Sequence, residues 1–342
     1  MEKPEDIIIG GIEGGGTHSS LIVMDGKGNQ LANIKGSSTN HWQIGMKETA
    51  KRIASMIDQA KEKLNIPDEH PLDCVGLCLS GCEERETNAK LVKTLQEDFP
   101  NISKEYVVES DTIGSLQTGC KNRGIVLIAG TGSNGLLVNS DGTTSSCGGW
   151  GHMMGDEGSA YWIAHKACKY IFDDIDGLEK APQSITYVWD IFKNFFQVNN
   201  QHEMLRHLYN DFDKSKFAMV TEKIAHGCQE NDELSLLLFS QAGQYLAKHI
   251  TGLLSKNSKF KNEKLRVICV GSVWKSWEFL KESFIKKIHE SNIIDELILL
   301  RLTTSSAVGA CYVAADKINC NSLVKTHDKN CDEFFTYKRD EY

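Results

Sequence analysis

A glycine-rich turn between two apolar runs occurs twice in this sequence, and it constrains the fold more than any other feature. In residues 7–32, IIIGGIEGGGTHSSLIVMDGKGNQLA, the turn Glu13-Gly14-Gly15-Gly16-Thr17 separates two apolar runs. Residues 125–138, IVLIAGTGSNGLLV, repeat the arrangement around Gly130-Thr131-Gly132. The apolar, β-branched runs predict buried strands. The repetition indicates an internal duplication, in which each half carries one strand–turn–strand unit.

Glycine turns of this kind can bind phosphate. Consecutive glycines adopt backbone angles closed to other residues and let N–H groups approach a ligand. Successive N–H groups then form a concavity that binds anions. A single turn could equally be structural, but two turns presented to a shared cleft favour a nucleotide site. Thr17 and Thr131 would place hydroxyls beside the phosphates, or would only stabilise the turns.

Strands and helices alternate after the first hairpin. We expect an amphipathic helix, a buried strand, a charged helix and a further strand, over residues 44–64, 72–79, 84–97 and 105–109. This alternation predicts an α/β domain with a partly parallel sheet. Because the second hairpin starts a new domain, the predicted division of the chain is 1–121 and 122–342.

The second domain should combine its hairpin with a glycine-rich loop and many helices. The loop, residues 147–158, contains five glycines. Each glycine loses much conformational freedom on folding, so a purely structural loop seldom contains so many. A mostly helical region follows, then two strands and a helix of small residues, over 184–256, 265–270, 297–302 and 304–315. The polar residues after about 318 are expected to form a loosely held tail.

Composition limits the class of protein. The chain has 342 residues, 40% hydrophobic and 25% charged, with a net charge of -8. This balance argues against nucleic acid or an anionic membrane as the main partner. The polar N-terminus lacks a signal peptide, and no apolar run is long enough to span a membrane, so we expect a cytoplasmic protein. The 11 cysteines are scattered, which favours reduced, buried thiols over disulfides or zinc.

Two carboxylates are candidates for chemistry. Asp111 follows a predicted strand and starts a helix, so it could cap that helix. It could instead act as a general base, because the carboxyl end of a strand faces the ligand edge of an α/β sheet. Glu13 lies inside the first turn. A carboxylate beside a triphosphate needs a cation between them, naturally Mg²⁺ with water; the alternative is a solvated turn residue.

Asn40 and Asp156 have the surroundings of sugar ligands. Each lies in a loop of small residues near a tryptophan, Trp42 and Trp150 respectively. Amides and carboxylates pair with sugar hydroxyls, while a planar ring covers the apolar face of the sugar. Either residue could instead stabilise its loop.

At these residues the sequence resembles eukaryotic N-acetylglucosamine kinases, within the superfamily of sugar kinases, heat-shock chaperones and actin. The resemblance spans nearly the whole chain and is carried by CGGWGHMMGDEGSAYWIAH, GGGTH, STNHW, LSGC, AGTGSN and VGSVWKSWE. It implies two actin-like (ribonuclease H-like) domains around a cleft for ATP and sugar. It also implies a cytoplasmic homodimer that dimerises through its second domain and uses ATP and Mg²⁺, with no metal coordinated directly by the protein.

The implied reaction moves the γ-phosphate of ATP to the 6-hydroxyl of N-acetyl-D-glucosamine in amino-sugar salvage, and in some members also phosphorylates muramyl dipeptide. By position, Asp111 matches the catalytic base. The matching sugar-site residues are Asn40, Ser80, Asp111, Ser133, Gly149, Trp150, Gly151 and Asp156. The matching ATP-site residues are Gly15, Gly16, Thr17, Thr131, Gly132, Ala218, Gly271 and Ser272, with Glu13 associated with Mg²⁺.

The resemblance has limits, and other functions stay open. The extreme N-terminus and the residues beyond about 317 depart from the family pattern, and Gly135 replaces a cysteine of the mammalian members. The alternatives are a kinase for glucose or N-acetylmannosamine, an ATPase that activates another protein, and a non-catalytic scaffold. The STNHW and GGWGHMMGDEG loops argue against the activator. An intact Asp111 and two intact turns argue against the scaffold.

Overall fold

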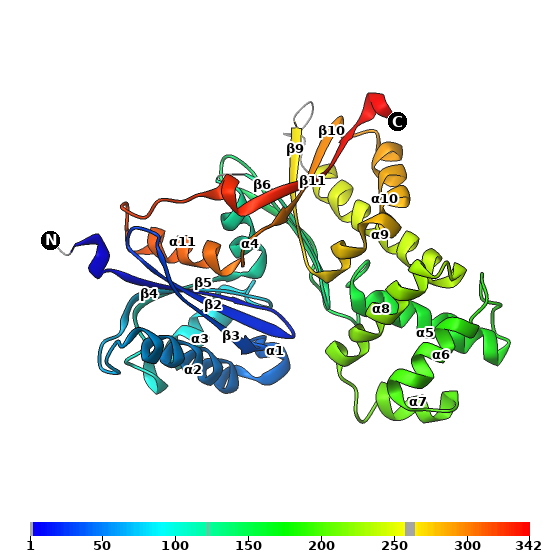
Figure 1. Cartoon of the computed structure of the whole chain (residues 1–342), viewed down its shortest axis with the longest axis horizontal. Helices are drawn as coiled ribbons and strands as arrows, with labels where there is room; N and C mark the ends of the chain where they lie inside the picture. The colour runs from blue at the N-terminus through cyan, green and yellow to red at the C-terminus, as the bar shows by residue number, and fades with distance from the viewer. Residues whose placement is uncertain (1–2, 122, 257–263) are drawn as a thin grey trace. The chain divides into compact units, whose positions relative to one another are not determined.

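The chain folds into two compact units, described here from a computed structural model that covers residues 3–121, 123–256 and 264–342 (Figure 1). The first unit comprises Met1–Val126, Val138–Thr143 and Leu300–Phe334, and the second comprises Leu127–Leu137, Thr144–Leu299 and Phe335–Tyr342. Each is organised around a sheet with helices, which confirms the predicted α/β class.

The first sheet has the strand order β3-β2-β1-β4-β5. Its strands are β1 (Ile8–Gly14), β2 (His18–Asp25), β3 (Gln30–Ser37), β4 (Leu72–Leu79) and β5 (Ser103–Ser110). β1 and β2 form the predicted antiparallel hairpin, whereas β1, β4 and β5 run parallel. Gly14 pairs with Leu79, and Leu79 with Ser110, so the three parallel strands end in register. This common end brings the first glycine turn close to the residues that follow β4 and β5, where ligands bind in α/β sheets.

Helices cover both faces of this sheet. The amphipathic helix predicted over 44–64 is α2 (Met46–Leu64), and Gly45 separates it from a short preceding helix, α1 (His41–Ile44). α2 and α3 (Arg85–Asp98) enclose one apolar core. α4 (Asp111–Gly119) and α11 (Ala307–Lys317) pack against each other, and α11 covers the opposite face of β1 and β4.

The packing of α11 on the first sheet requires glycines. A Cβ added to Gly11 would lie 2.3 Å from the carbonyl oxygen of Ala307, and one on Gly76 would lie 2.1 Å from that of Ala310. The division at residue 121 assigns this helix to the second domain. The structure instead packs it with the first unit, because its small side chains let the helix backbone approach β1 and β4.

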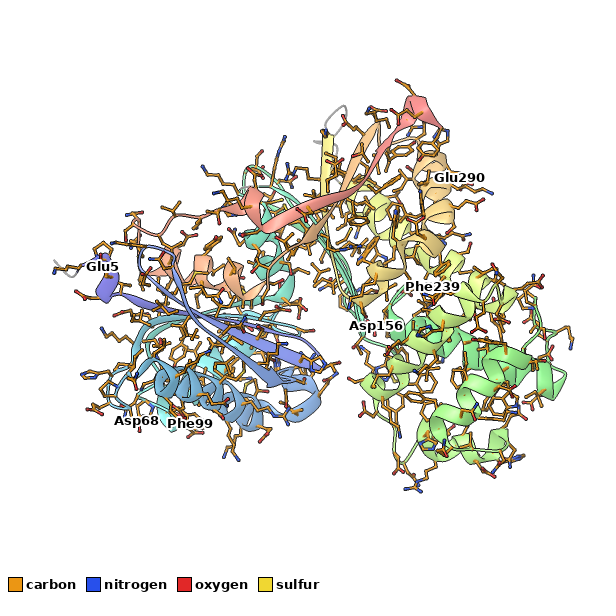
Figure 2. The ribbon with its side chains drawn as sticks, in the orientation of Figure 1. Glu5, Asp68, Phe99, Asp156, Phe239 and Glu290 are labelled. Atoms are coloured by element: carbon orange, nitrogen blue, oxygen red, sulfur yellow. The ribbon has the colours of Figure 1, made fainter. Side chains whose placement is uncertain are left out.

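The second sheet has the order β11-β10-β9-β6-β7-β8. Its strands are β6 (Gly124–Ala129), β7 (Ser133–Val138), β8 (Thr144–Gly148), β9 (Lys264–Val270), β10 (Glu296–Leu302) and β11 (Cys331–Lys338). The accompanying helices are α5 (Ala160–Asp176), α6 (Thr186–Phe196), α7 (Gln201–Leu208), α8 (Lys214–Gln229), α9 (Glu233–Ser255) and α10 (Trp277–Ser291). The predicted helical region over 184–256 is thus confirmed. Phe239 of α9, labelled in Figure 2, belongs to the buried interior.

The expectation of a loose C-terminal tail is wrong. Residues 331–338 form β11 at the edge of the second sheet. Tyr337 is completely buried, and its hydroxyl lies 2.9 Å from Nδ1 of His289 on α10. This anchoring aromatic holds the strand although most of its other residues are polar.

All 11 cysteines are free thiols, and eight of them are buried, as predicted. Cys74 and Cys78 lie on β4 with no exposed surface. Burial raises the pKa of the Cys74 thiol to about 12. Among the residues that the structure describes, no helix has the length and apolar character needed to cross a membrane.

Candidate active site

In the first glycine turn, atoms of neighbouring residues, and not unusual backbone angles, explain why glycine is required. Gly15 N–H donates to the carbonyl of His18 over 2.9 Å and closes the β1–β2 hairpin. A Cβ on Gly14 would lie 1.9 Å from Oγ1 of the buried Thr39. Gly14, Gly15 and Gly16 are all described, and none adopts a positive φ, which corrects the expectation of unusual angles. A Cβ on Gly15 would meet its nearest atom at 3.5 Å, so that position keeps space beside its backbone.

Ser80 and Asp111 lie at the ends of β4 and β5, next to this turn. Ser80 N–H donates to the carbonyl of Gly14 over 2.7 Å. Ser110 occupies the cap position of α4, so Asp111 is the first residue inside the helix. The structure therefore brings the first turn, Ser80 and Asp111 together at the common end of three parallel strands.

The environment of Asp111 suits a general base. Its Oδ1 atom is buried and has no hydrogen-bond partner in the described part of the chain. Burial, aided by the negative charges of Glu83 and Glu13, raises the pKa of the Asp111 carboxyl to about 7, although hydrogen bonds from Thr112 N–H and Ser80 oppose the shift. A pKa near neutrality is what general-base catalysis requires. Sequence reasoning missed Glu83, since it carries no motif of its own.

Glu13 is not a solvated turn carboxylate. It is the penultimate residue of β1, and its Oε2 accepts a 2.9 Å hydrogen bond from the hydroxyl of Ser305, just before α11. Burial raises the pKa of Glu13, while hydrogen bonds from Ser305 and the Ser306 backbone oppose that rise. A half-buried carboxylate at this position fits the predicted water-mediated Mg²⁺ contact.

Asn40 adjoins the same strand ends through Trp42. Asn40 caps α1, where its Oδ1 accepts from Trp42 N–H over 3.0 Å. The Trp42 indole is largely exposed and donates from Nε1 to the carbonyl of Gly81 over 3.0 Å. The structure thus groups Asn40, Trp42, Ser80 and Asp111 within the first unit.

In the second unit, the second glycine turn lies at the start of α5. Gly130 N–H donates to the carbonyl of Gly132 over 2.9 Å. The N–H groups of Ala160 and Tyr161 donate to the carbonyls of Gly130 and Thr131 over 2.9 and 3.2 Å. The N-terminal N–H groups of α5 therefore hold the carbonyls of the turn in place. A Cβ on Gly130 would meet no atom within 4 Å, so this turn also keeps open space beside it.

Asp156 ties the glycine-rich loop to this turn. This residue, labelled in Figure 2, adopts φ +68, and it is 2% exposed. Its Oδ1 accepts from Ser133 N–H over 3.1 Å, and its Oδ2 lies 2.7 Å from Nζ of Lys214. Ser133 also donates its hydroxyl to the carbonyl of Glu157 and accepts at its own carbonyl from Gly149 N–H. The sequence offered no signal for Lys214, because its partner lies far away along the chain.

The loop around Trp150 is shaped by glycines. Gly148, Gly149 and Gly151 adopt φ values of +85, +79 and +74, which few other residues tolerate. The Trp150 side chain is 77% exposed. The five-glycine loop therefore presents this ring to solvent, as a sugar-stacking surface requires.

The predicted adenosine residues lie behind the second turn. Gly271 has φ +108, and a Cβ there would lie 2.3 Å from the carbonyl oxygen of Ala129. Ser272 starts a short 3-10 helix in which Trp274 donates from Nε1 to the carbonyl of Leu127 over 3.2 Å. Ala218 is buried on α8, one turn after Lys214.

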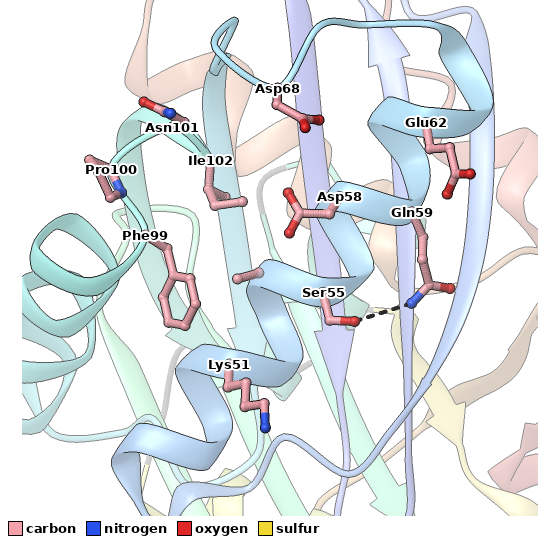
Figure 3. Close-up of a pocket in the computed structure, with 11 residues that line it drawn as sticks. Lys51, Ser55, Asp58, Gln59, Glu62, Asp68, Phe99, Pro100, Asn101 and Ile102 are labelled. Atoms are coloured by element: carbon pink, nitrogen blue, oxygen red, sulfur yellow. Dashed lines mark hydrogen bonds between the residues drawn. The ribbon is translucent and has the colours of Figure 1, made fainter.

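A separate surface groove lies away from these residues. It has a volume of about 730 Å³ and runs along α2 opposite residues 99–102 (Figure 3). Asp58, Asp68 and Phe99 are among its lining residues. No predicted site residue lines it, so it is not part of the candidate active site.

Solved structures of proteins named as sugar kinases share this fold over nearly the whole chain. A crystal structure of a candidate N-acetylglucosamine kinase from Chromobacterium violaceum matches with a TM-score of 0.72 and 21% identity, over 91% of this chain and 100% of that chain. A ROK family glucokinase from Streptomyces griseus, solved with glucose and AMPPNP, matches with a TM-score of 0.59 and 13% identity, over 90% and 99% of the two chains.

Sequence comparison defines the family. Residues 11–313 match the BadF/BadG/BcrA/BcrD ATPase family, and the chain belongs to it. An N-acetyl-D-glucosamine kinase of Dictyostelium discoideum is 28% identical over 315 residues, 89% of this chain and 96% of the relative. An N-acetylmuramic acid/N-acetylglucosamine kinase of Clostridium acetobutylicum is 26% identical over 309 residues, 89% and 97% of the two chains.

Proposed function

We propose that this protein is an ATP-dependent kinase that phosphorylates the 6-hydroxyl of N-acetyl-D-glucosamine. The observation that carries the proposal is Asp111, whose Oδ1 is buried without a hydrogen-bond partner among the described residues and whose carboxyl has a pKa of about 7, beside the first glycine turn. Relatives that match nearly the full chain are named for this reaction. N-acetylmuramic acid derivatives such as muramyl dipeptide are proposed as secondary acceptors, supported by the name of the Clostridium relative.

The proposed reaction is an in-line phosphoryl transfer. Asp111 accepts the proton of the 6-hydroxyl, the oxygen electron pair attacks the γ-phosphorus, and the bond from that phosphorus to the bridging oxygen breaks. ADP leaves with the electrons of the broken bond, and the proton stays on Asp111 until solvent removes it. Bound Mg²⁺ would neutralise the phosphate charge, and Glu13 would orient its water shell.

The other residues bind and orient the substrates in this proposal. Gly15, Gly16 and Thr17 in the first unit, and Thr131 and Gly132 in the second, bind the phosphates through backbone N–H groups and hydroxyls. Gly271, Ser272 and Ala218 contact the adenosine. Sugar hydroxyls pair with Asn40 and Ser80 in the first unit, and the second contributes Ser133, Asp156 and the segment Gly149, Trp150 and Gly151.

We further propose that the enzyme works as a cytoplasmic homodimer. The 11 free cysteines support a reducing compartment. The dimer rests on the resemblance of the sequence to kinases that form one. Light scattering of the purified protein should give about twice the mass of one chain, and a monomer would contradict this part of the proposal.

Coupled measurement of ADP release tests the proposed activity. Mg²⁺-ATP is supplied alone and with N-acetylglucosamine, glucose or N-acetylmannosamine. We expect release only with N-acetylglucosamine, together with a 6-phosphate product identified by NMR. Equal release without sugar would favour an ATPase that activates another protein, and strongest release with another sugar would reassign the acceptor. No release in any well would contradict the kinase function.

A further inference from the structure

Lys214 lies at the second phosphate turn, although no sequence motif marks it. It is the first residue of α8, and its Nζ is 2.7 Å from Oδ2 of Asp156. A Cβ built on Gly132 would lie 3.2 Å from the same Nζ atom. The Lys214 side chain is 18% exposed and that of Asp156 is 3% exposed. This is a largely buried ion pair, and removing one partner of such a pair leaves an uncompensated charge inside the protein.

The Asp156 carboxylate connects three segments. Ser133, whose backbone N–H donates to Oδ1 of Asp156, directly follows the phosphate turn. Gly149 and Glu157 belong to the glycine-rich loop and bond to the Ser133 backbone and hydroxyl at 3.1 and 2.9 Å. Lys214 adds the N-terminus of α8. Because Asp156 has a φ that non-glycine residues rarely adopt, these partners must hold it in place.

The charges of Asp156 and Lys214 affect how well the second turn can bind an anion. An unpaired Asp156 carboxylate would put a buried negative charge against the turn that receives phosphate. We propose that Lys214 is a positioning residue of the nucleotide site: it neutralises Asp156 and thereby holds the phosphate turn and the 148–158 loop in a binding-competent arrangement. The inference rests on the proposed function only in taking this turn as part of the nucleotide site.

Replacement of the lysine gives the first test. Lys214→Met keeps most of the aliphatic stem and removes the ammonium. Lys223→Met makes the same change at an exposed position of α8 and serves as the matched control. Isothermal titration of each protein with Mg²⁺-ADP should show affinity weakened about tenfold or more by Lys214→Met. Lys223→Met should leave it near the wild-type value. Lys214→Arg should restore most of the loss, because a guanidinium also pairs with a carboxylate.

A double variant decides whether Lys214 acts through Asp156. Asp156→Asn removes the negative charge and keeps an oxygen that can accept from Ser133 N–H. We expect Lys214→Met to cause little further loss of ADP affinity when it is added to Asp156→Asn. An equal loss in both backgrounds would mean that Lys214 meets the phosphate directly, and would overturn the proposal. So would a Lys214→Met protein that behaves like Lys223→Met.

Two measurements keep these outcomes separate. Thermal unfolding is recorded for every variant, and the charge-free double variant decides the question if Lys214→Met does not fold. Phosphorylation of N-acetylglucosamine by the wild-type protein is measured in parallel. A wild-type protein that binds ADP without phosphorylating the sugar would refute the proposed kinase, while the comparison of ADP affinities would still support or overturn the role of Lys214.

Discussion

The backbone N–H of Ser80 donates a 2.7 Å hydrogen bond to the carbonyl oxygen of Gly14. Through this bond, the residue after β4 fixes the position of Gly14, the first glycine of the first turn. The same serine lies close enough to Asp111 for its side chain to oppose the rise in the carboxyl's pKa. One residue thus relates the backbone of the first glycine turn to the proposed base.

Asp111→Asn should abolish turnover without disturbing substrate binding. The amide is similar in shape but cannot accept the proton of the sugar hydroxyl, so we expect kcat to fall about 10²–10⁴-fold with little change in KM. Steady-state kinetics with N-acetylglucosamine measure this. Asp98→Asn, at the exposed end of α3, is the control and should retain wild-type rates. A normal kcat for the Asp111→Asn enzyme would contradict the role of Asp111 as the general base.

The pH profile should report the ionisation of Asp111. With a pKa of about 7, the base is lost as pH falls through neutrality, so kcat/KM should decline on the acid side. Glu83→Gln removes a negative charge that raises this pKa, and should shift the acid limb to lower pH. Glu86→Gln, an exposed neighbour on α3, should leave the limb in place. Identical profiles for Glu83→Gln and wild type would contradict the electrostatic role of Glu83.

The same carboxyl should destabilise the fold at high pH. Its folded-state pKa of about 7 exceeds its ordinary value of 3.8, so its contribution to stability is fully present below 3.8 and is lost as pH rises through 7. Asp111→Asn removes the ionisation. The midpoint of thermal unfolding of this variant should therefore exceed that of wild type at pH 8, and the difference should vanish near pH 4. A variant that is less stable than wild type at pH 8 would be inconsistent with a raised pKa.

Gly271→Ala should impair nucleotide binding through the second turn. The new Cβ would lie 2.3 Å from the carbonyl of Ala129 and 2.7 Å from the N of Gly130, so the turn backbone must shift. Gly142→Ala is the control. Gly142 also has a positive φ, so its replacement introduces backbone strain, but a Cβ there meets no atom within 4 Å and causes no clash. We expect ADP affinity to fall strongly in Gly271→Ala only. Equal affinities in titrations of the two variants would exclude a role for this close approach.

Tyr337→Ala should destabilise the second unit. The ring is fully buried and its hydroxyl bonds to His289, so truncation should cost about 3 kcal/mol or more in the free energy of unfolding. Tyr209→Ala, at an exposed position of the second unit, should cost little. Urea unfolding followed by circular dichroism compares the two. Similar midpoints for both variants would mean that β11 contributes nothing to stability.

Local sequence patterns predicted the elements with strong apolar signals. β4 spans residues 72–79 as expected, because its apolar run is bounded by Pro71 and Ser80. β3 was missed because QLANIKGS has only two apolar residues, Ala32 and Ile34, on its inward face, and it becomes a strand by pairing with β2. β8 and β11 were missed for a similar reason: TSSCG is polar, and CDEFFTYK depends on the buried Tyr337.

The candidate site also contains residues that the local sequence identifies and residues that it does not. Asp111 was visible from the chain because it follows a strand and starts a helix. Glu83 and Lys214 were not, because their influence on Asp111 and Asp156 depends on distances in space between residues apart in sequence. The sequence drew attention to the glycines of the first turn through their backbone angles, whereas Gly14 is required because of Thr39, a neighbour that no local pattern identifies.

The position of α11 has a consequence for synthesis of the protein. β1 and β4 leave the ribosome early, yet the helix that covers one of their faces ends at Lys317. Until that point is translated, Gly11 and Gly76 border an uncovered apolar surface. The core on this face of the first sheet therefore cannot close until almost the whole chain has been made, and over that interval the exposed apolar face favours association with chaperones.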